Sequence, residues 1–441
     1  MLLPRRVHSA LLFAGLLLLI RATPARAGTG QADPVVPLLL ALVLVLGIAK
    51  LGGWLAMKIR QPAVLGEIVM GIALGNLGLL GLHGLEPLRS DSTLGILASL
   101  GVILLLFEVG LESSVAQMLR VGRSSFYVAV LGVVTPFALG WALGAWLLPG
   151  HSPYVHAFLG AVLTATSVGI TARVLRDLGR VDSPEGKIIL GAAVIDDVLG
   201  LLVLAVISGV IVAADRGGPG IAPGALALIA GKALAFLAGA IVLGQVLAPS
   251  LLRLAARVRV PGVLLTSGLL FCFLLAYLAA RAGLAPIVGA FAAGLILEPP
   301  HFKEFEESRK QSLESLLHPI STFLVPVFFV LTGLRVELAS FADPTVVALA
   351  AALTAAAIIG KQACSLGAVE RGLNRLSIGI GMIPRGEVGL IFANVGASLT
   401  VAGERVIIPA TYSAVVIMVV VTTLITPPAL QWSLRRRGGT P

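Results

Sequence analysis

The chain has 441 residues, of which 57% are hydrophobic and 12% are charged. Its mean hydropathy of +1.01 excludes an ordinary soluble domain, in which about a quarter of the residues are charged. The formal charge of +10 does not indicate nucleic-acid binding, because the basic residues lie between apolar runs and do not cluster on one soluble face. The composition is that of a polytopic membrane protein.

The N-terminal segment 1–27 has the three parts of a secretory signal. Arg5 and Arg6 precede an apolar run from Ala10 to Ile20, and the small-residue sequence Ala25-Arg26-Ala27 follows it. The apolar run is too short to cross a bilayer comfortably. We predict that 1–27 is a signal peptide that does not belong to the fold, and a retained membrane anchor is the alternative.

Apolar runs of the length needed to cross a bilayer, about 20 residues, occupy most of the remaining chain. They predict an all-α polytopic membrane protein with thirteen transmembrane helices near 35–58, 62–83, 92–110, 124–148, 154–175, 187–214, 224–248, 260–281, 284–298, 319–334, 345–369, 376–398 and 407–430. Lys and Arg concentrate in alternate loops, whereas the opposite loops contain only Arg89, Arg216, Arg281, Arg335 and Arg405. The positive-inside rule therefore predicts an external N-terminus after signal removal and a cytoplasmic C-terminus.

Thirteen helices divide into two groups of six around one connecting helix. The predicted parts are a first repeat, a linker helix, a second repeat and a short basic cytoplasmic tail, at 35–214, 224–248, 260–430 and 431–441. An offset of seven helices reverses orientation, so the repeats would be inverted copies, as in many secondary transporters. The fifth and twelfth helices occupy matching positions, and polar or helix-breaking residues interrupt both. Paired broken helices of this kind indicate an ion site near the bilayer midplane.

Two adjacent carboxylates, Asp196 and Asp197, lie inside a run that is otherwise apolar from Ile188 to Ala214. Each carboxylate costs about 2.5–3.5 kcal/mol at the centre of a membrane helix if nothing compensates it. Lys361, within another apolar run, is the predicted partner of one aspartate, and a purely structural ion pair is the alternative. Neighbouring helical residues point about 100° apart, so the other aspartate can face a mobile cation.

Polar residues at the two helix breaks complete the candidate site. Thr164, Thr166 and Ser167 are candidate oxygen ligands, and ordinary helix packing is their alternative role. Arg385 and Glu387 follow Pro384 and are predicted to neutralise each other and the exposed helix ends, with direct ion handling as the alternative.

A carboxylate, hydroxyls and free backbone carbonyls at a helix break are suitable ligands for a hard monovalent cation. A proton and a cation that compete for one carboxylate would be exchanged across the membrane. A cation channel would be expected to have a filter of carbonyls or charged rings, and no such loop is evident. The phosphate-loop and zinc-protease motifs of enzymes are also absent from the sequence. A sensor that keeps the site without transport remains an alternative.

Several segments together resemble the monovalent cation:proton antiporter-2 family, in particular bacterial sodium/proton antiporters of the NapA type. They are Leu65-Gly66-Glu67-Ile68, Thr164-Ala165-Thr166-Ser167, Ala193-Val194-Ile195-Asp196-Asp197, Lys361 and Pro384-Arg385-Gly386-Glu387-Val388-Gly389-Leu390. The resemblance covers nearly all of the chain after residue 35. It implies the NhaA-like antiporter fold and a homodimer in the bacterial plasma membrane, in which a core formed by 124–214 and 345–430 slides against a dimerisation domain.

The resemblance also implies a role for each matching residue. Asp197 would carry the cation and the proton, Asp196 would pair with Lys361 in the ion-free state, and Thr166 would neighbour the site. Potassium-transporting members often have a glutamine before the aspartate and a nucleotide-binding domain; this sequence has neither, which favours sodium or lithium. We expect two protons per sodium ion and no cofactor beyond the transported ions.

Overall fold

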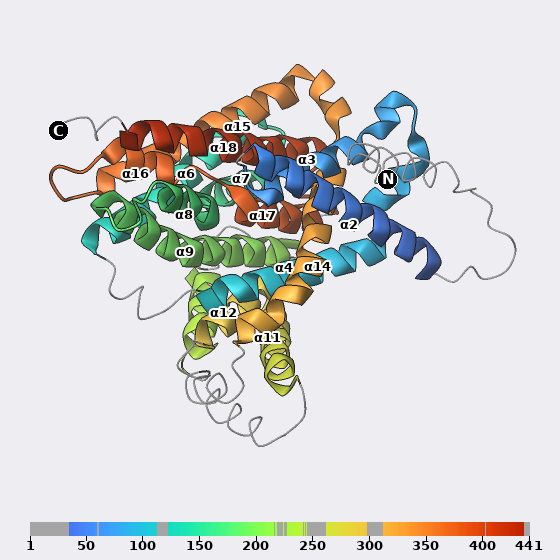
Figure 1. The fold of residues 1–441 in the computed structure, drawn as a ribbon, viewed down its shortest axis with the longest axis horizontal. Helices are drawn as coiled ribbons and strands as arrows, with labels where there is room; N and C mark the ends of the chain where they lie inside the picture. The colour runs from blue at the N-terminus through green and yellow to red at the C-terminus, as the bar shows by residue number, and fades with distance from the viewer. Residues whose placement is uncertain are drawn as a thin grey trace, which may run out of the picture. The chain divides into compact units, whose positions relative to one another are not determined.

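The computed structural model describes residues 35–59, 61–112, 122–215, 217, 224, 227–240, 242, 244, 262–297, 312–401 and 403–435. The predicted signal peptide, 1–27, lies outside these residues, and the predicted linker helix, 224–248, is described only in part, with a helix over 227–240. The described chain is almost entirely helical (Figure 1).

Most described α-helices lie at the predicted apolar segments. The first half contains α2 (Val35–Lys58), α3 (Ala63–Gly75), α4 (Ser92–Glu112), α6 (Arg123–Leu147), α7 (Pro153–Thr164), α8 (Val168–Asp177) and α9 (Pro184–Asp215). The second half contains α11 (Val263–Arg281), α12 (Pro286–Ile296), α14 (Leu313–Leu334), α15 (Pro344–Ala363), α16 (Arg375–Gly381), α17 (Gly386–Ser398) and α18 (Pro409–Arg435). However, α3 ends at Gly75, short of the predicted 83, and α14 begins at Leu313, before the predicted 319. Because α18 reaches Arg435, the tail predicted at 431–441 is helical in the part that the structure describes, 431–435.

Short elements connect these helices. The 3-10 turns are η1 (Leu77–Leu80), η2 (His83–Arg89), η4 (Leu338–Ala342) and η5 (Cys364–Gly367). A two-stranded antiparallel hairpin of β1 (Thr400–Val401) and β2 (Glu404–Arg405) joins α17 to α18, with Thr400 opposite Arg405. Gly403 lies within this hairpin at φ +82°, a backbone conformation that favours glycine.

Local sequence signals explain several helix starts. The Asp343 side chain accepts a hydrogen bond from the Thr345 amide and caps α15, with Pro344 at its first position. Asn374 caps α16 in the same way through the Ser377 amide. Each cap satisfies a backbone N–H that has no partner within its helix. The Asp343 carboxylate lies outside the helical span, and hydrogen bonding to Thr345 lowers its pKa.

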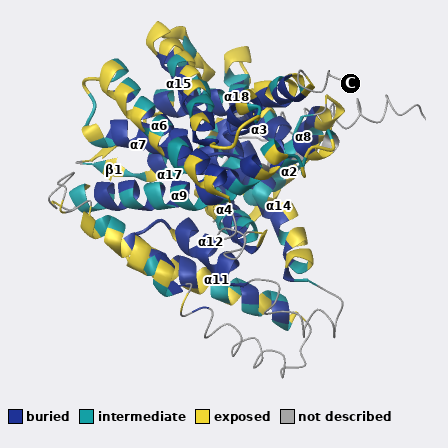
Figure 2. Ribbon diagram, turned by 90° about the vertical axis from the view of Figure 1, so that its left-hand side faces the viewer, coloured by how far each residue is buried: buried dark blue, intermediate teal, exposed yellow. Residues whose placement is uncertain are grey.

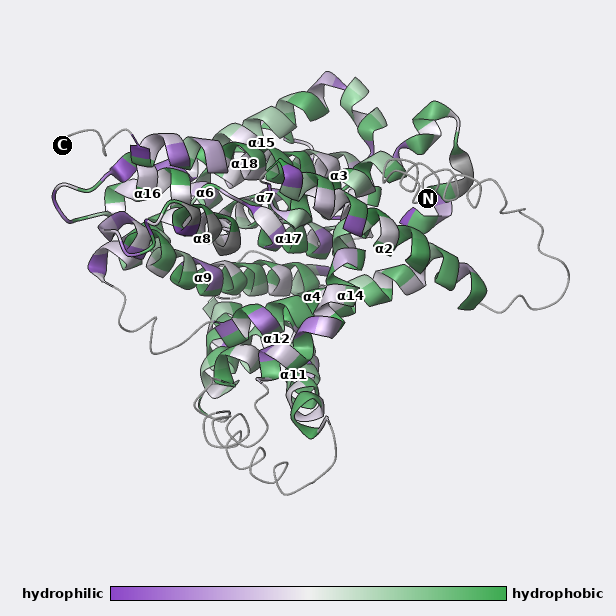
Figure 3. Cartoon of the chain, in the orientation of Figure 1, coloured by the Kyte–Doolittle hydropathy of each residue, from purple (hydrophilic) through white to green (hydrophobic). Residues whose placement is uncertain are grey.

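Length and composition identify which described helices can cross a membrane. Eight are long and apolar enough, and counting the bent pair of α16 and α17 as one span makes nine among the described residues. Figure 3 shows hydrophobic residues along α9 and α11, with hydrophilic residues gathered at turns near α8 and α16. Large apolar side chains such as Trp146, Leu270 and Tyr277 remain exposed on helix surfaces, as expected for surfaces that contact lipid tails. The chain is therefore an all-helical membrane protein.

The described chain forms two compact units, which we treat separately. The first combines the chain up to Gly101 with Phe323–Ala339, and the second contains Val102–Thr322 and Ser340–Pro441. Each unit thus draws on both expected repeats, 35–214 and 260–430. The helices α11 and α12, which the sequence analysis left outside the core, belong to the second unit.

Within the first unit, glycines allow helix backbones to approach closely. A Cβ atom on Gly66 of α3 would overlap the Gly52 carbonyl of α2, and one on Gly71 would overlap the Val330 carbonyl of α14. Small residues at helix contacts are typical of membrane proteins, where close van der Waals packing replaces the hydrophobic effect between helices. Gly66 and Gly71 therefore determine how closely α3 packs against α2 and α14.

We expect Gly66→Ala to lower the free energy of unfolding by about 1–3 kcal/mol, because the added methyl group forces α2 and α3 apart. Thermal unfolding of the purified protein in detergent measures this loss. Gly47→Ala on α2 is the matched control, since nothing lies within 4 Å of a Cβ at that position. Equal melting temperatures for the two variants would contradict the packing role of Gly66.

The second unit contains the candidate site. Its helices α6, α7, α9, α15, α17 and α18 contact one another, and Figure 2 shows buried residues concentrated among α6, α7, α17 and α18, with exposed residues on α11 and the outer part of α15. Fully buried polar groups lie within this unit, among them Thr164, Asp196, Lys361 and Arg385. Because buried charges require partners, we expect the functional site among these residues.

Candidate functional site

Both helices that the sequence analysis expected to be broken are broken. The first helix stops at Thr164 and resumes at Val168, so that 165–167 is non-helical between α7 and α8. The second stops at Gly381 and resumes at Gly386, and α16 and α17 differ in direction by 46°. Pro384 lacks a backbone N–H and disfavours a continuous helix. Each break leaves backbone carbonyls and amides without partners in their own helix.

The two breaks lie against each other and supply many of these missing partners. The Ser167 amide donates to the Pro384 carbonyl at 2.8 Å, and the Thr171 hydroxyl donates to the Gly381 carbonyl at 2.6 Å. A Cβ atom on residue 386 would overlap the Ser167 side chain, and Gly386 has φ +33°. Glycine is therefore required there both by the close approach and by the backbone conformation.

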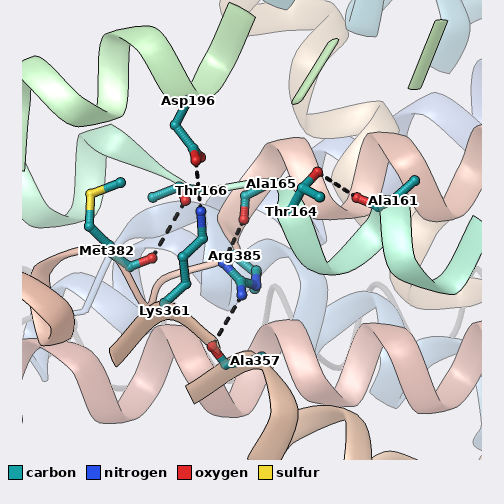
Figure 4. Close-up of polar contacts among 9 residues, drawn as sticks. All are labelled: Ala161, Thr164, Ala165, Thr166, Asp196, Ala357, Lys361, Met382 and Arg385. Atoms are coloured by element: carbon teal, nitrogen blue, oxygen red, sulfur yellow. Dashed lines mark hydrogen bonds and ion pairs between the residues drawn. The ribbon is translucent and has the colours of Figure 1, made fainter. Parts of the chain in front are cut away.

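Lys361 of α15 and Asp196 of α9 form the expected ion pair. Lys361 Nζ donates to Asp196 Oδ1 at 2.8 Å, and both side chains are fully buried (Figure 4). Gly132 of α6 makes room for the pair, because a Cβ there would lie 3.3 Å from Lys361 Nζ and 3.4 Å from Asp196 Oδ1. The second carboxylate oxygen, Asp196 Oδ2, is buried and has no hydrogen-bond partner among the described residues.

Asp197 has a different environment from its neighbour. Its side chain is half-buried, whereas Asp196 is 1% exposed. Asp197 Oδ1 is buried without a hydrogen-bond partner in the part of the chain that the structure describes. An unsatisfied buried carboxylate oxygen is costly unless a proton or a cation satisfies it. Asp197 therefore combines partial access with an unfilled bonding position.

The three candidate hydroxyls lie at the first break, each with a partner. Thr164 Oγ1 donates to the Ala161 carbonyl at 2.7 Å, and Thr166 Oγ1 lies 3.5 Å from the Met382 carbonyl of the second break (Figure 4). Ser167 Oγ donates to Glu387 Oε2 at 2.9 Å. A hydroxyl that donates its proton keeps lone pairs for a cation, so these contacts agree with both ligation and packing.

Arg385 and Glu387 do not neutralise each other, which corrects that prediction. The Arg385 guanidinium donates to the Ala165 carbonyl at 2.8 Å and to the Ala357 carbonyl at 3.2 Å (Figure 4). Ala165 directly follows α7, so Arg385 interacts with the negative end of that helix, and Glu387 lies in the first turn of α17. The expected effect on helix ends is present, but each charge acts on a different end.

Two residues at these contacts were missed by the sequence analysis. Gly132 gave no signal, because a glycine in a membrane helix is common and its neighbours come from distant parts of the chain. The sequence contains a weak signal for Thr171, because this residue lies one helical turn after Ser167 and therefore shares a helix face with it. The arrangement as a whole brings hydroxyl and carbonyl oxygens of the two breaks together, in the same compact unit as Asp197.

Comparison with known proteins identifies the family of this chain. A family model described as the transmembrane sodium/hydrogen exchanger matches residues 37–435. The high-affinity Na(+)/H(+) antiporter NhaS3 of Synechocystis is 38% identical over 428 residues, which cover 89% of each chain. The Na(+)/H(+)-K(+) antiporter GerN of Bacillus cereus is 34% identical, covering 89% of this chain and 95% of the relative.

A solved structure has a similar fold. The sodium proton antiporter MjNhaP1 of Methanocaldococcus jannaschii superposes with a TM-score of 0.67 at 18% sequence identity, covering 90% of this chain and 99% of that one. At 18% identity the match supports a similar fold and nothing further. The helical arrangement described above is therefore of the antiporter kind.

Proposed function

Because this chain belongs to the sodium/hydrogen exchanger family, we propose that it is a secondary transporter that exchanges sodium or lithium ions for protons across the bacterial plasma membrane, with Asp197 as the ion carrier. The observation that supports this assignment is the half-buried Asp197 carboxylate, with one oxygen unsatisfied, next to the buried Asp196–Lys361 pair. Asp196 is less suited to the role, because Lys361 already balances its charge.

Exchange follows from competition at one carboxylate. A proton neutralises Asp197, and a cation can replace it only when that proton leaves, so the group binds one or the other. Thr164, Thr166 and Ser167 would supply further oxygens, with backbone carbonyls of the breaks and water completing the cation's shell. Transport then requires that the site face each side of the membrane in turn.

We further propose that transport is electrogenic, with two protons exchanged per sodium ion. Lysine can lose its proton when it is desolvated, whereas arginine cannot, so Lys361 is the group suited to the second proton.

We propose thirteen helices in two inverted repeats, a homodimer, and an elevator-like movement of the core formed by 124–214 and 345–430 against the dimerisation domain. An external N-terminus and a cytoplasmic C-terminus belong to the same proposal.

Potassium is the competing cation. The printed name of the relative GerN includes K+, and the oxygens around Asp197 do not by themselves discriminate between monovalent ions of different size. A channel or a non-transporting sensor with the same fold is the competing function. The three alternatives differ in their response to a pH gradient and to the cation supplied.

Reconstitution into liposomes that contain a pH-sensitive dye tests the proposal. We expect sodium or lithium to dissipate an imposed pH gradient at concentrations where potassium has at least about tenfold less effect, since the proposal assigns the site to the smaller ions. A current on a supported membrane, driven by a sodium gradient, is expected from the stoichiometry. Cation flux that ignores the pH gradient would favour a channel, and absence of any flux would favour a sensor.

A further inference from the structure

Glu387 occupies a defined position at the crossing of the two breaks. It lies in the first turn of α17, and its Oε2 accepts a hydrogen bond from Ser167 Oγ at 2.9 Å. The close approach of Gly386 to the Ser167 side chain and the hydrogen bond from the Ser167 amide to Pro384 hold these elements together. The carboxylate is thus held at the break that contains the candidate cation ligands.

The surroundings of Glu387 contain other acids but no neutralising side chain among the described residues. Its carboxylate lies within electrostatic range of Asp197 and also of Glu112 at the end of α4. The nearest basic residue in sequence, Arg385, donates instead to the Ala165 and Ala357 carbonyls. Glu387 is half-buried, and its carboxylate lies at the positive end of the α17 helix dipole.

The formal charges at the crossing give Glu387 a specific consequence. With all groups ionised, Asp196, Asp197 and Glu387 contribute three negative charges, and Lys361 and Arg385 contribute two positive ones. One monovalent cation balances the remaining negative charge while Lys361 keeps its proton. Without Glu387 the same group of residues would be neutral before any cation arrived.

We propose that Glu387 is a second ion-facing carboxylate, whose charge, together with the Ser167 hydroxyl, sets the affinity of the Asp197 site for the transported cation. This inference rests on the proposed function, because it assigns Glu387 a part in the same site. The charge attracts the cation toward Asp197, and the hydrogen bond from Ser167 keeps the carboxylate at the crossing.

The test compares Glu387→Gln, Glu387→Asp and Ser167→Ala with the unaltered protein in the liposome assay. Loss of the charge is expected to raise the KM for sodium by about tenfold or more, since a neighbouring unit charge acts strongly at the intermediate dielectric of a protein. The Asp variant keeps the charge and should stay within about threefold of the original KM. Ser167→Ala removes a candidate cation oxygen and the hydrogen bond that holds the carboxylate, so it is expected to raise the KM, but by less than Glu387→Gln. Glu404→Gln, at an exposed position of β2, is the matched control and should leave the KM for sodium unchanged.

A second measurement does not depend on transport. Sodium that binds the folded protein raises its melting temperature in detergent, and Glu387→Gln should require about tenfold more sodium for the same rise. An unchanged sodium requirement in Glu387→Gln, or an equal loss in Glu387→Asp, would overturn the assignment. If Asp197→Asn still exchanges ions, the proposed function itself fails; if only the Glu387 variants behave like the original, this inference alone fails.

Discussion

Asp197→Asn is expected to reduce cation–proton exchange to the level of protein-free liposomes. The amide can neither bind a transported proton nor supply negative charge to a cation, while its size and hydrogen-bonding capacity stay close to those of the acid. The Asp196–Lys361 pair does not require Asp197 as a hydrogen-bond partner, so the fold should be retained. Dye-monitored exchange in liposomes, with gel filtration as a check of folding, measures the effect.

Asp182→Asn is the matched control for this variant. Asp182 is exposed in the turn between α8 and α9, so the same chemical change there should leave exchange at its original rate. Persistent sodium-dependent exchange in a well-folded Asp197→Asn protein would show that another group carries the ion, and the assignment of the site would then be wrong.

Lys361→Gln is expected to have the largest effect on stability, about 3–5 kcal/mol, because it leaves the buried carboxylate of Asp196 without its counter-charge. Thermal unfolding in detergent should show a lower melting temperature. The sodium-driven current on a supported membrane should also fall, since the proposal gives Lys361 a share of the charge balance. The two measurements separate a structural role of the pair from a role in transport.

The double variant Asp196→Asn with Lys361→Gln should recover much of the lost stability, because removing both buried charges avoids the uncompensated one. Lys187→Gln, at an exposed position of α9, controls for the loss of a lysine elsewhere. Undiminished current in Lys361→Gln would exclude Lys361 from the charge balance. Unchanged stability would indicate that the Asp196 carboxylate finds another partner.

The positions of the membrane helices were accessible from the sequence. The predicted helix 35–58 coincides with α2, and the breaks near 164–167 and 384–386 lie where Thr, Ser, Pro and Gly interrupt apolar runs. The reason is local: a helix in lipid must satisfy its own backbone hydrogen bonds and present a continuous apolar run. Even the pairing of Lys361 with an aspartate followed from the cost of an isolated charge in the membrane.

Sequence separation was a poor guide to which charges meet. Arg385 and Glu387 are two residues apart, yet Arg385 reaches Ala165 and Ala357, and Glu387 reaches Ser167. A helix break changes the chain direction between them, so the two side chains have different neighbours. Which charge meets which partner therefore depended on the crossing of two distant segments.

Composition and periodicity by themselves determined that this chain is a helical membrane protein with two interrupted helices and an acidic centre, because those features arise from interactions within single segments. Composition left open which aspartate pairs with Lys361, and the family resemblance implied Asp196. The tertiary structure shows that pair and shows that Gly132 makes room for it. Adjacent residues on one helix face different neighbours. The choice between them is made by helices that are far apart in the chain.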